Sequence, residues 1–375
     1  MIYFDNAATT NIADEVLEEM MPYLSDKYGN PGSRHRKGAE ALEAIDTARH
    51  RVALLLGCDH SNVFFTSCGS ESNTLAITGL TEYLKTIGKR HIITTAAEHE
   101  SVIESVMEME RRGFDITILP VDETARVSIV ELDNAIRGDT GLIAVMAVNN
   151  ELGTDNDIRA ISEICRKKNV LFHCDCVQAA LGHRTEAGLF DSCSISGHKI
   201  HAPKGIGAVY LRNPERYHNI IFGGEQENGL RPGTQNVAGI VALGKAAEMA
   251  YDNRVEIISG TTELCRRFAE KLNGTDGVRC FYSTPFSKIV SVYVYGVDAQ
   301  SLIIALDNAG VAVSSGAACT SHEVLPNRVL KAAGRTDEEA SSTIRVSFSE
   351  YNTKEEVDEA AEILFGIVEK FRTLK

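Results

Sequence analysis

Strand-like and helix-like segments alternate along the first two thirds of the chain. Residues 62–66 and 90–95 are short β-rich runs, and helical patterns at 70–84 and 100–112 follow them. Residues 142–148 (LIAVMAV) are continuously apolar, which is typical of a strand buried on both faces. The alternation also includes predicted strands at 115–119 and 170–173 and a predicted helix at 158–168. Serial strand–helix units predict an α/β fold with a mainly parallel sheet and helices on both faces.

The pattern changes after residue 254, and a chain of 375 residues is long for a single hydrophobic core. Residues 261–273 and 354–371 have a helical period, and 288–295 (KIVSVYVY) alternate like a half-buried strand. Shorter elements of the same region are a helix at 299–309 and strands at 311–313 and 343–347. We therefore predict a large domain at 14–254 and a small α+β domain formed by 1–13 and 255–375.

Composition narrows the classes of function. The chain has 38 lysines and arginines against 52 acidic residues, a net charge of −14, which disfavours nucleic-acid partners and anionic membrane surfaces. No leader pattern opens the sequence and no apolar run could span a bilayer, so we predict a cytoplasmic protein. The nine cysteines are then expected to be reduced. The nearest approach to a metal cluster is His173, Cys174 and Cys176, where structural thiols are the favoured interpretation and no metal is predicted.

Lys199 lies in a polar loop between two short β runs, within residues 194–210 (SISGHKIHAPKGIGAVY). Ser196 and His198 offer hydrogen-bond donors to an anion, and Gly205 and Gly207 permit a tight return of the backbone. A lysine with a depressed pKa can act as a nucleophile toward a carbonyl group. Most lysines are only solvated, but this context favours a functional one.

Asp175 lies at the end of a predicted buried strand, in residues 173–178 (HCDCVQ). A buried carboxylate is costly unless it is paired, and the pyridinium nitrogen of pyridoxal phosphate (PLP) is a suitable partner. Gln178 could donate to the ring hydroxyl of PLP. Taken alone, Asp175 is better explained as the cap of a following helix. The presence of Lys199 some two dozen residues later favours the cofactor.

A third motif, residues 64–73 (FFTSCGSESN), reads as a strand, a Gly/Ser turn and a helix. The free N–H groups of Gly69 and Ser70 at such a helix start would suit a phosphate. The alternative is a capping box between Ser70 and Asn73, and both interpretations can hold together.

Together these motifs resemble the NifS/IscS-like cysteine desulfurases, which belong to the class-V aminotransferase group of fold-type-I PLP enzymes. The resemblance covers nearly the whole chain, and its specificity comes from the number, order and spacing of the matching segments. Besides the three motifs above, these segments are 3–10 (YFDNAATT), 28–33 (YGNPGS), 98–99 (EH), 148–154 (VNNELGT), 231–236 (RPGTQN), 314–321 (SSGAACTS) and 343–347 (TIRVS). The resemblance implies a PLP-binding domain with a mainly parallel, seven-stranded sheet and a small domain that carries a catalytic cysteine.

The resemblance also implies how the cofactor is held. Lys199 would bind PLP covalently, Asp175 would pair with the ring nitrogen, Gln178 with the ring oxygen, and His99 would stack on the ring and shuttle protons. The phosphate would be bound by residues of several loops, namely Gly69, Ser70, Ser196 and His198, and by Thr234 reaching from the neighbouring subunit of a homodimer.

On the substrate side, the resemblance implies that Asn150 contacts the cofactor and, with Arg345, anchors the carboxylate of L-cysteine. Arginine suits this role because its fork meets a carboxylate with two hydrogen bonds, although a surface ion pair is the alternative for Arg345. Cys319 would take the sulfur of the substrate as a persulfide. The spacing from Cys319 to Arg345 is similar to that of the long-loop, IscS-like branch, which delivers sulfur to an acceptor such as an iron–sulfur scaffold or a tRNA-thiolation enzyme.

Several positions depart from the family pattern. His201 and Ala202 replace a tyrosine-like residue and a glycine, Cys68 and Ser70 replace the commoner glycine and threonine, and residues 347–351 (SFSEY) lack a glycine. Selenocysteine lyase or another class-V PLP aminotransferase therefore stays open as an alternative function. A non-catalytic scaffold of the same fold is a further alternative.

Overall fold

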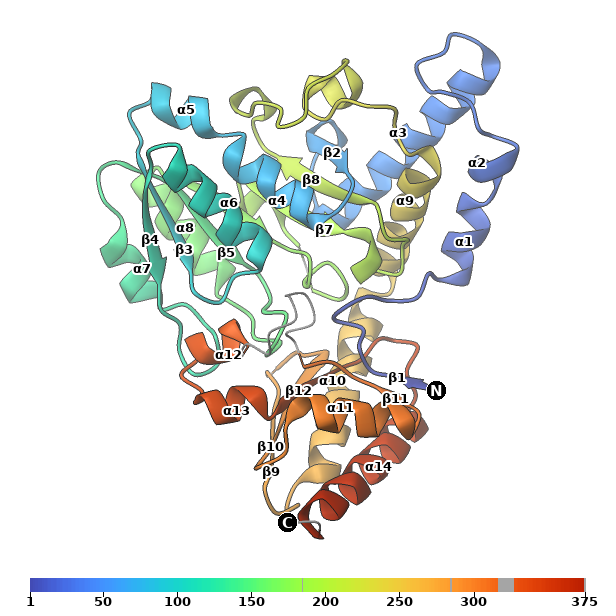
Figure 1. Ribbon diagram of the computed structural model, residues 1–375. Helices are drawn as coiled ribbons and strands as arrows, with labels where there is room; N and C mark the ends of the chain where they lie inside the picture. The colour runs from blue at the N-terminus through green and yellow to red at the C-terminus, as the bar shows by residue number, and fades with distance from the viewer. Residues whose placement is uncertain (184, 284, 316–326, 374–375) are drawn as a thin grey trace.

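The computed structural model describes residues 1–183, 185–283, 285–315 and 327–373. Within these residues the larger part of the molecule has a seven-stranded sheet in the order β2-β8-β7-β6-β5-β3-β4 (Figure 1). Its neighbouring strands are parallel except at β8, which is antiparallel to β2 and β7. The strands are β2 (Val63–Thr66), β3 (His91–Thr95), β4 (Asp115–Leu119), β5 (Thr140–Met146), β6 (Leu171–Asp175), β7 (Ser192–Ser196) and β8 (Gly207–Leu211). The predicted mainly parallel sheet is confirmed.

Alternating side chains of the strands pack into two separate hydrophobic cores, one on each face of the sheet. Ile92, Leu142 and Ala144 pack in the core under the helices on one face, whereas Ile93 and Ile143 pack in the core on the other. The first face is covered by α4 (Gly69–Thr78), α5 (Thr81–Thr86) and α6 (Glu100–Arg111). Helices that contribute to the second core are α1 (Asp14–Met20), α3 (Arg36–Leu56), α8 (Ile158–Lys168) and α9 (Val237–Asp252). Burial on both faces explains the continuous apolar runs in the sequence.

The helix predicted at 70–84 is wrong in one respect, because the structure divides it into α4 and α5. Gly79 ends α4 where the chain at His218 crosses it, and the His218 amide donates to the Gly79 carbonyl at 2.9 Å. A Cβ at position 79 would lie 2.9 Å from the His218 carbonyl oxygen. The break is therefore caused by a contact between distant segments.

The smaller part joins the N-terminal segment to the C-terminal third of the chain. β1 (Ile2–Tyr3) pairs in parallel with β11 (Val311–Ala312), and β9 (Val278–Phe281), β10 (Ile289–Val294) and β12 (Thr343–Ser347) form an antiparallel sheet. Its helices are α10 (Arg254–Leu272), α11 (Ala299–Asn308) and α14 (Lys354–Thr373). The rings of Phe4, Phe268 and Phe348 form its centre, with centroids 4.7–6.3 Å apart. The predicted domain limits at 13/14 and 254/255 stay a prediction.

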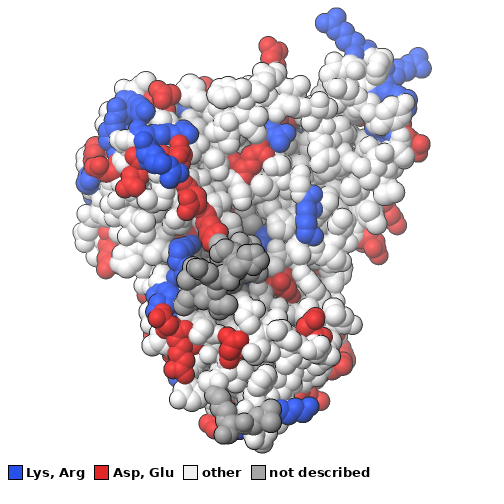
Figure 2. All heavy atoms as spheres, viewed as in Figure 1, with Lys and Arg blue, Asp and Glu red and all other residues white. Residues whose placement is uncertain are grey.

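Short elements complete the described chain. They are α2 (Pro22–Ser25), α7 (Ile129–Ala135), α12 (Arg328–Ala332), α13 (Asp337–Ser341) and the 3₁₀ turns His60–Asn62, Ala187–Leu189, Gly197–Lys199, Pro214–Arg216 and Gln226–Gly229. No helix in the described part of the chain is long and apolar enough to cross a membrane. Among the same residues, no group of three or more His, Cys, Asp or Glu side chains could hold a metal ion. Acidic and basic side chains are intermixed on the face shown in Figure 2.

Candidate active site

The predicted cofactor and substrate residues meet at the carboxyl ends of β5, β6 and β7. The N-terminal segment and β12 reach this edge from the smaller part of the molecule, where the Thr10 amide donates to the His198 carbonyl at 2.9 Å and Arg345 Nη1 donates to the Asn150 carbonyl at 2.9 Å. Parallel sheets bind ligands at this edge, because the loops that follow the strands converge there.

Lys199 lies in the 3₁₀ turn directly after β7. Its Nζ donates to the carbonyl oxygens of Ala7 at 2.5 Å and Ala8 at 2.7 Å. Gln178 Nε2 donates to the same Ala7 oxygen at 2.9 Å. The N-terminal segment thus brings together the two residues that the sequence assigns to the aldehyde and the ring oxygen of PLP.

Asp175 ends β6 and is only 6% exposed. Its Oδ1 accepts from the Val177 amide at 2.9 Å, and its Oδ2 accepts from Asn73 Nδ2 at 2.8 Å. The alternative role as a helix cap is wrong, because the residues that directly follow are turns. A carboxylate held on both oxygens in a buried position is suited to a cationic ring nitrogen.

Asn73 is a site residue that the sequence prediction missed. Its amide nitrogen also donates to Ser101 Oγ at 2.9 Å, and its oxygen lies 3.0 Å from His173 Nε2 and accepts from Ser194 Oγ at 2.5 Å. Both donors and both acceptor sites of the amide are therefore used. The predicted capping box of Ser70 and Asn73 is wrong, since α4 begins after Cys68 and Asn73 faces the strands.

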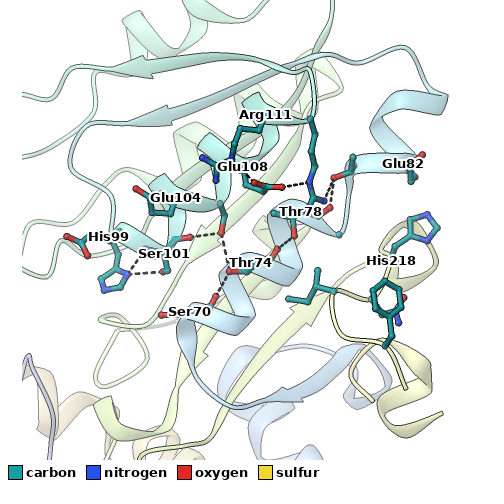
Figure 3. Close-up of a pocket in the computed structure, with 18 residues that line it drawn as sticks. Ser70, Thr74, Thr78, Glu82, His99, Ser101, Glu104, Glu108, Arg111 and His218 are labelled. Atoms are coloured by element: carbon teal, nitrogen blue, oxygen red, sulfur yellow. Dashed lines mark hydrogen bonds and ion pairs between the residues drawn. The ribbon is translucent and has the colours of Figure 1, made fainter. Parts of the chain in front are cut away.

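His99 is connected to this amide through Ser101. The Ser101 amide donates to His99 Nδ1 at 3.1 Å, and Ser101 Oγ lies 2.8 Å from the same nitrogen (Figure 3). Because Nδ1 accepts the amide proton, the neutral ring carries its own proton on Nε2. Ser70 and His99 are exposed and line a groove of about 790 Å³ between α4 and α6.

The predicted phosphate end is the start of α4 facing the loop after β7. Gly69 allows close approach there, because a Cβ would lie 2.8 Å from Val177 Cγ2 and 3.4 Å from Ser196 Cβ. The first amides of a helix have no partner within the helix and carry a positive partial charge. Burial, with help from nearby Lys199 and Lys204, lowers the pKa of His198 to about 4. His198 is therefore neutral at pH 7 and would serve an anion as a hydrogen-bond donor.

Arg345 lies in β12 and is only 6% exposed, so its alternative role as a surface ion pair is wrong. Its Nη1 lies 3.0 Å from Glu151 Oε1 and its Nη2 lies 3.2 Å from Asp5 Oδ1. Burial raises the pKa of both acids, and Arg345 counters this shift. Asn150 Nδ2 donates to Glu151 at 2.6 Å, so both predicted carboxylate anchors share one acid.

Another buried acid, Glu98, precedes His99. It is fully buried, its Oε1 accepts from Thr95 Oγ1 at 2.8 Å, and burial raises its pKa to about 8. Glu98 is therefore protonated near pH 7.

Unpartnered polar atoms test whether the site fits the implied cofactor and substrate. Within the described part of the chain, buried atoms without a hydrogen-bond partner include Ser196 Oγ, Gln178 Oε1, Asn150 Oδ1 and Arg345 Nε. These four are part of a set of nine such atoms in the described residues, and all four belong to residues that the sequence assigns to the site. Buried polar groups normally have partners, so these atoms indicate a polar ligand. Ser196 Oγ and Arg345 Nε can donate to a phosphate and a carboxylate, whereas Gln178 Oε1 and Asn150 Oδ1 can only accept, as from a ring hydroxyl and an amine.

One predicted residue of the described chain is not brought to this site. Thr234 is exposed, and no described residue forms a hydrogen bond with its side chain. Cys319 lies outside the described residues. The departing residue His201 is 3% exposed, and its Nε2 lies 3.3 Å from Glu350 Oε2 of the smaller part.

The mainly parallel sheet, the buried Asp175 and the lysine turn beside a helix start define the class of PLP-dependent α/β enzymes of fold type I. The chain belongs to the aminotransferase class-V family, whose model matches residues 2–360. Members of this family depend on PLP, so the predicted family, fold class and cofactor are confirmed.

The chain is also similar, over nearly its whole length, to individual proteins of this family. Cysteine desulfurase IscS of Dictyoglomus turgidum is 41% identical over 386 residues, which cover 100% of this chain and 96% of that protein. Cysteine desulfurase IscS of Clostridium botulinum strain Hall is 38% identical over 385 residues, with 100% and 96% covered. A solved NifS-like protein has a TM-score of 0.92 at 36% identity and covers 98% of this chain and 99% of its own. A structure described as SspA in complex with cysteine has a TM-score of 0.82 at 33% identity, with 94% and 100% covered.

Proposed function

We propose that this chain is a PLP-dependent cysteine desulfurase, which converts L-cysteine to L-alanine and retains the sulfur as a persulfide on Cys319. The observation that carries the proposal is the buried site itself, in which Lys199 and Asp175 lie on one side and Arg345 on the other. The four unpartnered atoms suit the phosphate and ring hydroxyl of a cofactor and the carboxylate and amine of an amino acid. Relatives that are named cysteine desulfurases match the chain over its whole length.

The residues of the chain have distinct tasks in this reaction. Arg345 binds and orients the carboxylate of the substrate, because its Nε is a buried donor without a partner among the described residues. Asn150 Nδ2 donates to Glu151, and its unpartnered Oδ1 would accept from the amine of the substrate. The amine of Lys199 holds the cofactor and then carries the proton at the substrate Cα. Bound PLP supplies an electron sink for the negative charge that develops at Cα. His99, with a proton on Nε2, is placed to give or take a proton at the ring.

Sulfur transfer balances without an external oxidant. The thiolate of Cys319 attacks the sulfur of the substrate, a sulfur–sulfur bond forms, and the carbon–sulfur bond of the substrate breaks. Its bonding electron pair stays on carbon and is protonated, so L-alanine leaves and Cys319 carries the additional sulfur. A thiol has an ordinary pKa near ~8.5, and only its thiolate is nucleophilic.

The test is to incubate purified protein with PLP and L-cysteine. We expect L-alanine in solution and, without reductant, a mass gain of one sulfur atom on the peptide that contains Cys319. Cys319→Ser should still bind PLP and should form no alanine from cysteine. Protein that binds PLP but gives no alanine would contradict the proposal.

The alternatives give different results in the same assay. An aminotransferase would consume amino acid with formation of a keto acid and would keep this activity in Cys319→Ser. A selenocysteine lyase would prefer selenocysteine to cysteine when both are offered. A non-catalytic scaffold would remain colourless with PLP, and borohydride would fix no label on Lys199.

A homodimer in the cytoplasm, with Thr234 reaching the neighbouring phosphate site, completes the proposal. The groove beside Ser70 and His99 supports a second copy there, since Phe222 on its rim is 89% exposed. Mixing Lys199→Ala with Thr234→Ala subunits should restore activity in part, because one site of a mixed dimer is then intact. An iron–sulfur scaffold or a tRNA-thiolation enzyme is the proposed sulfur acceptor.

A further inference from the structure

Glu151 is a buried acid that the reaction above does not use. It is 5% exposed, and the described residues that hydrogen-bond its carboxylate are all donors. Its Oε1 accepts from Asn150 Nδ2 at 2.6 Å and from Arg345 Nη1 at 3.0 Å. Its Oε2 accepts from Asn327 Nδ2 at 3.0 Å. One carboxylate thus joins both predicted substrate anchors to a third segment of the chain.

The charge of Glu151 works against substrate binding. Arg345 already faces Asp5, so two carboxylates share one guanidinium before an amino-acid carboxylate arrives. A buried acid beside an anion-binding arginine weakens the binding of a further anion, since like charges in a buried site repel strongly. The hydrogen bonds of Glu151 must then serve the geometry of the site. Through Nη1 they fix the guanidinium and leave Arg345 Nε without a partner among the described residues.

Asn327 has two tasks at the start of α12. Its Oδ1 caps the helix by accepting from the amides of Val329 at 2.9 Å and Leu330 at 3.3 Å, while its Nδ2 binds Glu151. The next residue, Arg328, donates to the carbonyl oxygens of Ala96 and Glu98. The segment that begins at residue 327 is therefore attached to the loops that carry His99 and Asn150.

The other flank is attached to the same arginine. The backbones of Ser314 and Arg345 exchange hydrogen bonds of 2.6 and 3.2 Å. Arg345 is thus bonded directly to the chain before residues 316–326 and, through Glu151, to the chain after them.

We propose that Glu151 is a positioning residue whose carboxylate sets the orientation of Arg345 and Asn150 and the attachment of Asn327 as one unit. The inference rests on the proposed function, because it assigns the substrate carboxylate to Arg345. In this proposal the negative charge of Glu151 weakens binding of the substrate carboxylate, whereas its hydrogen bonds hold Arg345 and Asn150 in the orientation that turnover needs.

Two substitutions test the hydrogen bond between Glu151 and Asn327, one at each of the two residues. Glu151→Gln keeps the shape but offers one acceptor oxygen in place of two, so it cannot serve donors on both sides. Asn327→Ser keeps a good helix cap but cannot reach Glu151. The control is Thr336→Ala, which removes the capping box of the neighbouring α13 and does not touch Glu151.

The first measurement is steady-state alanine formation from L-cysteine by the holoenzyme. For Glu151→Gln we expect kcat to fall by about tenfold or more while KM is unchanged or lower, since orientation is lost and a repelling charge is removed. For Asn327→Ser we expect kcat to fall about threefold to tenfold with KM within about twofold. The double variant should be no worse than Glu151→Gln, because both changes disrupt the same unit. Thr336→Ala should keep both constants.

The second measurement is hydrogen exchange of the α12 amides, which needs no turnover. Glu151→Gln should accelerate exchange at residues 328–332 by about fivefold through loss of the contact with Asn327. Exchange and kinetic constants equal to those of Thr336→Ala would overturn the inference, and so would a higher KM with unchanged kcat. If the wild type forms no alanine, the proposed function fails instead, and the exchange result alone decides on the unit.

Discussion

Asn73→Ala removes an amide that is fully used by its neighbours beneath the cofactor site. Asn73 is 1% exposed and is bonded to the side chains of Asp175, His173 and Ser194. Without it, Asp175 keeps only the Val177 amide as a hydrogen-bond donor to its carboxylate among the described residues. His173 Nε2 and Ser194 Oγ lose the oxygen that they now share.

The expected losses follow from these contacts. A buried polar group left without its partner costs about 1–3 kcal/mol, and water can enter the vacated space, so we expect the free energy of unfolding to fall by about 3–5 kcal/mol. A hydrogen bond to a charged group is worth about 1.5–3 kcal/mol. If Asp175 is the partner of the ring nitrogen, PLP affinity should fall about tenfold to a hundredfold.

The matched control is Asn156→Ala, which removes another buried asparagine. Asn156 bonds the Val127 amide at 3.0 Å and the Met146 carbonyl at 2.9 Å, and does not contact Asp175. Unfolding of the apo proteins is followed by circular dichroism, since the chain has no tryptophan, and PLP affinity by absorbance on reconstitution. Both variants should be destabilised, but only Asn73→Ala should lose PLP affinity. Equal affinity in the two variants would refute the role of Asn73 in holding Asp175.

Other parts of the site give further predictions. Gly69→Ala would place a Cβ 2.8 Å from Val177 Cγ2, so we expect PLP affinity measured by reconstitution to fall at least about tenfold; unchanged affinity would contradict the close approach. Folding raises the pKa of Glu98 from 4.5 to about 8, so the folded form retains a proton. The stability of the wild type relative to Glu98→Gln should therefore be greatest below pH 4.5 and decline up to pH 8, by as much as about 5 kcal/mol; a flat difference in urea titrations would contradict this. Arg345→Lys cannot bond Asp5 and Glu151 while also binding a carboxylate with two hydrogen bonds, so KM for L-cysteine should rise about tenfold or more; an unchanged KM would place the substrate carboxylate elsewhere.

Local patterns predicted the elements that local forces determine. The run at 142–148 is β5 (Thr140–Met146), with every residue buried, and the helix at 158–168 is α8 (Ile158–Lys168). In α8, Asp157 caps the start and Asn169 ends the helix in a left-handed conformation. Both limits of this helix are therefore determined by residues at its own ends. Residues with strong chemistry at strand ends, such as Asp175 and Lys199, could be placed in the same way.

The contacts between segments could not be read from these patterns. Asn73 resembled part of a capping box because it follows Ser70 by three positions, whereas its partner Asp175 lies 102 positions away. The helix predicted at 70–84 is interrupted at Gly79, where the distant chain at His218 crosses it. Glu151 and Arg345 are 194 positions apart, and neither sequence context indicates that they form a buried pair.

The separation of these partners also means that folding orders the site before any ligand arrives. Arg345 meets Asp5 across 340 positions and Glu151 across 194, so both parts of the molecule must be folded before the guanidinium has its orientation. The entropy of ordering these side chains is lost during folding and not during binding. The unpartnered Ser196 Oγ and Arg345 Nε are the cost of that order, because each is desolvated without a hydrogen bond. A ligand that bonds them recovers this free energy, and this favours tight binding of a polar molecule that spans both.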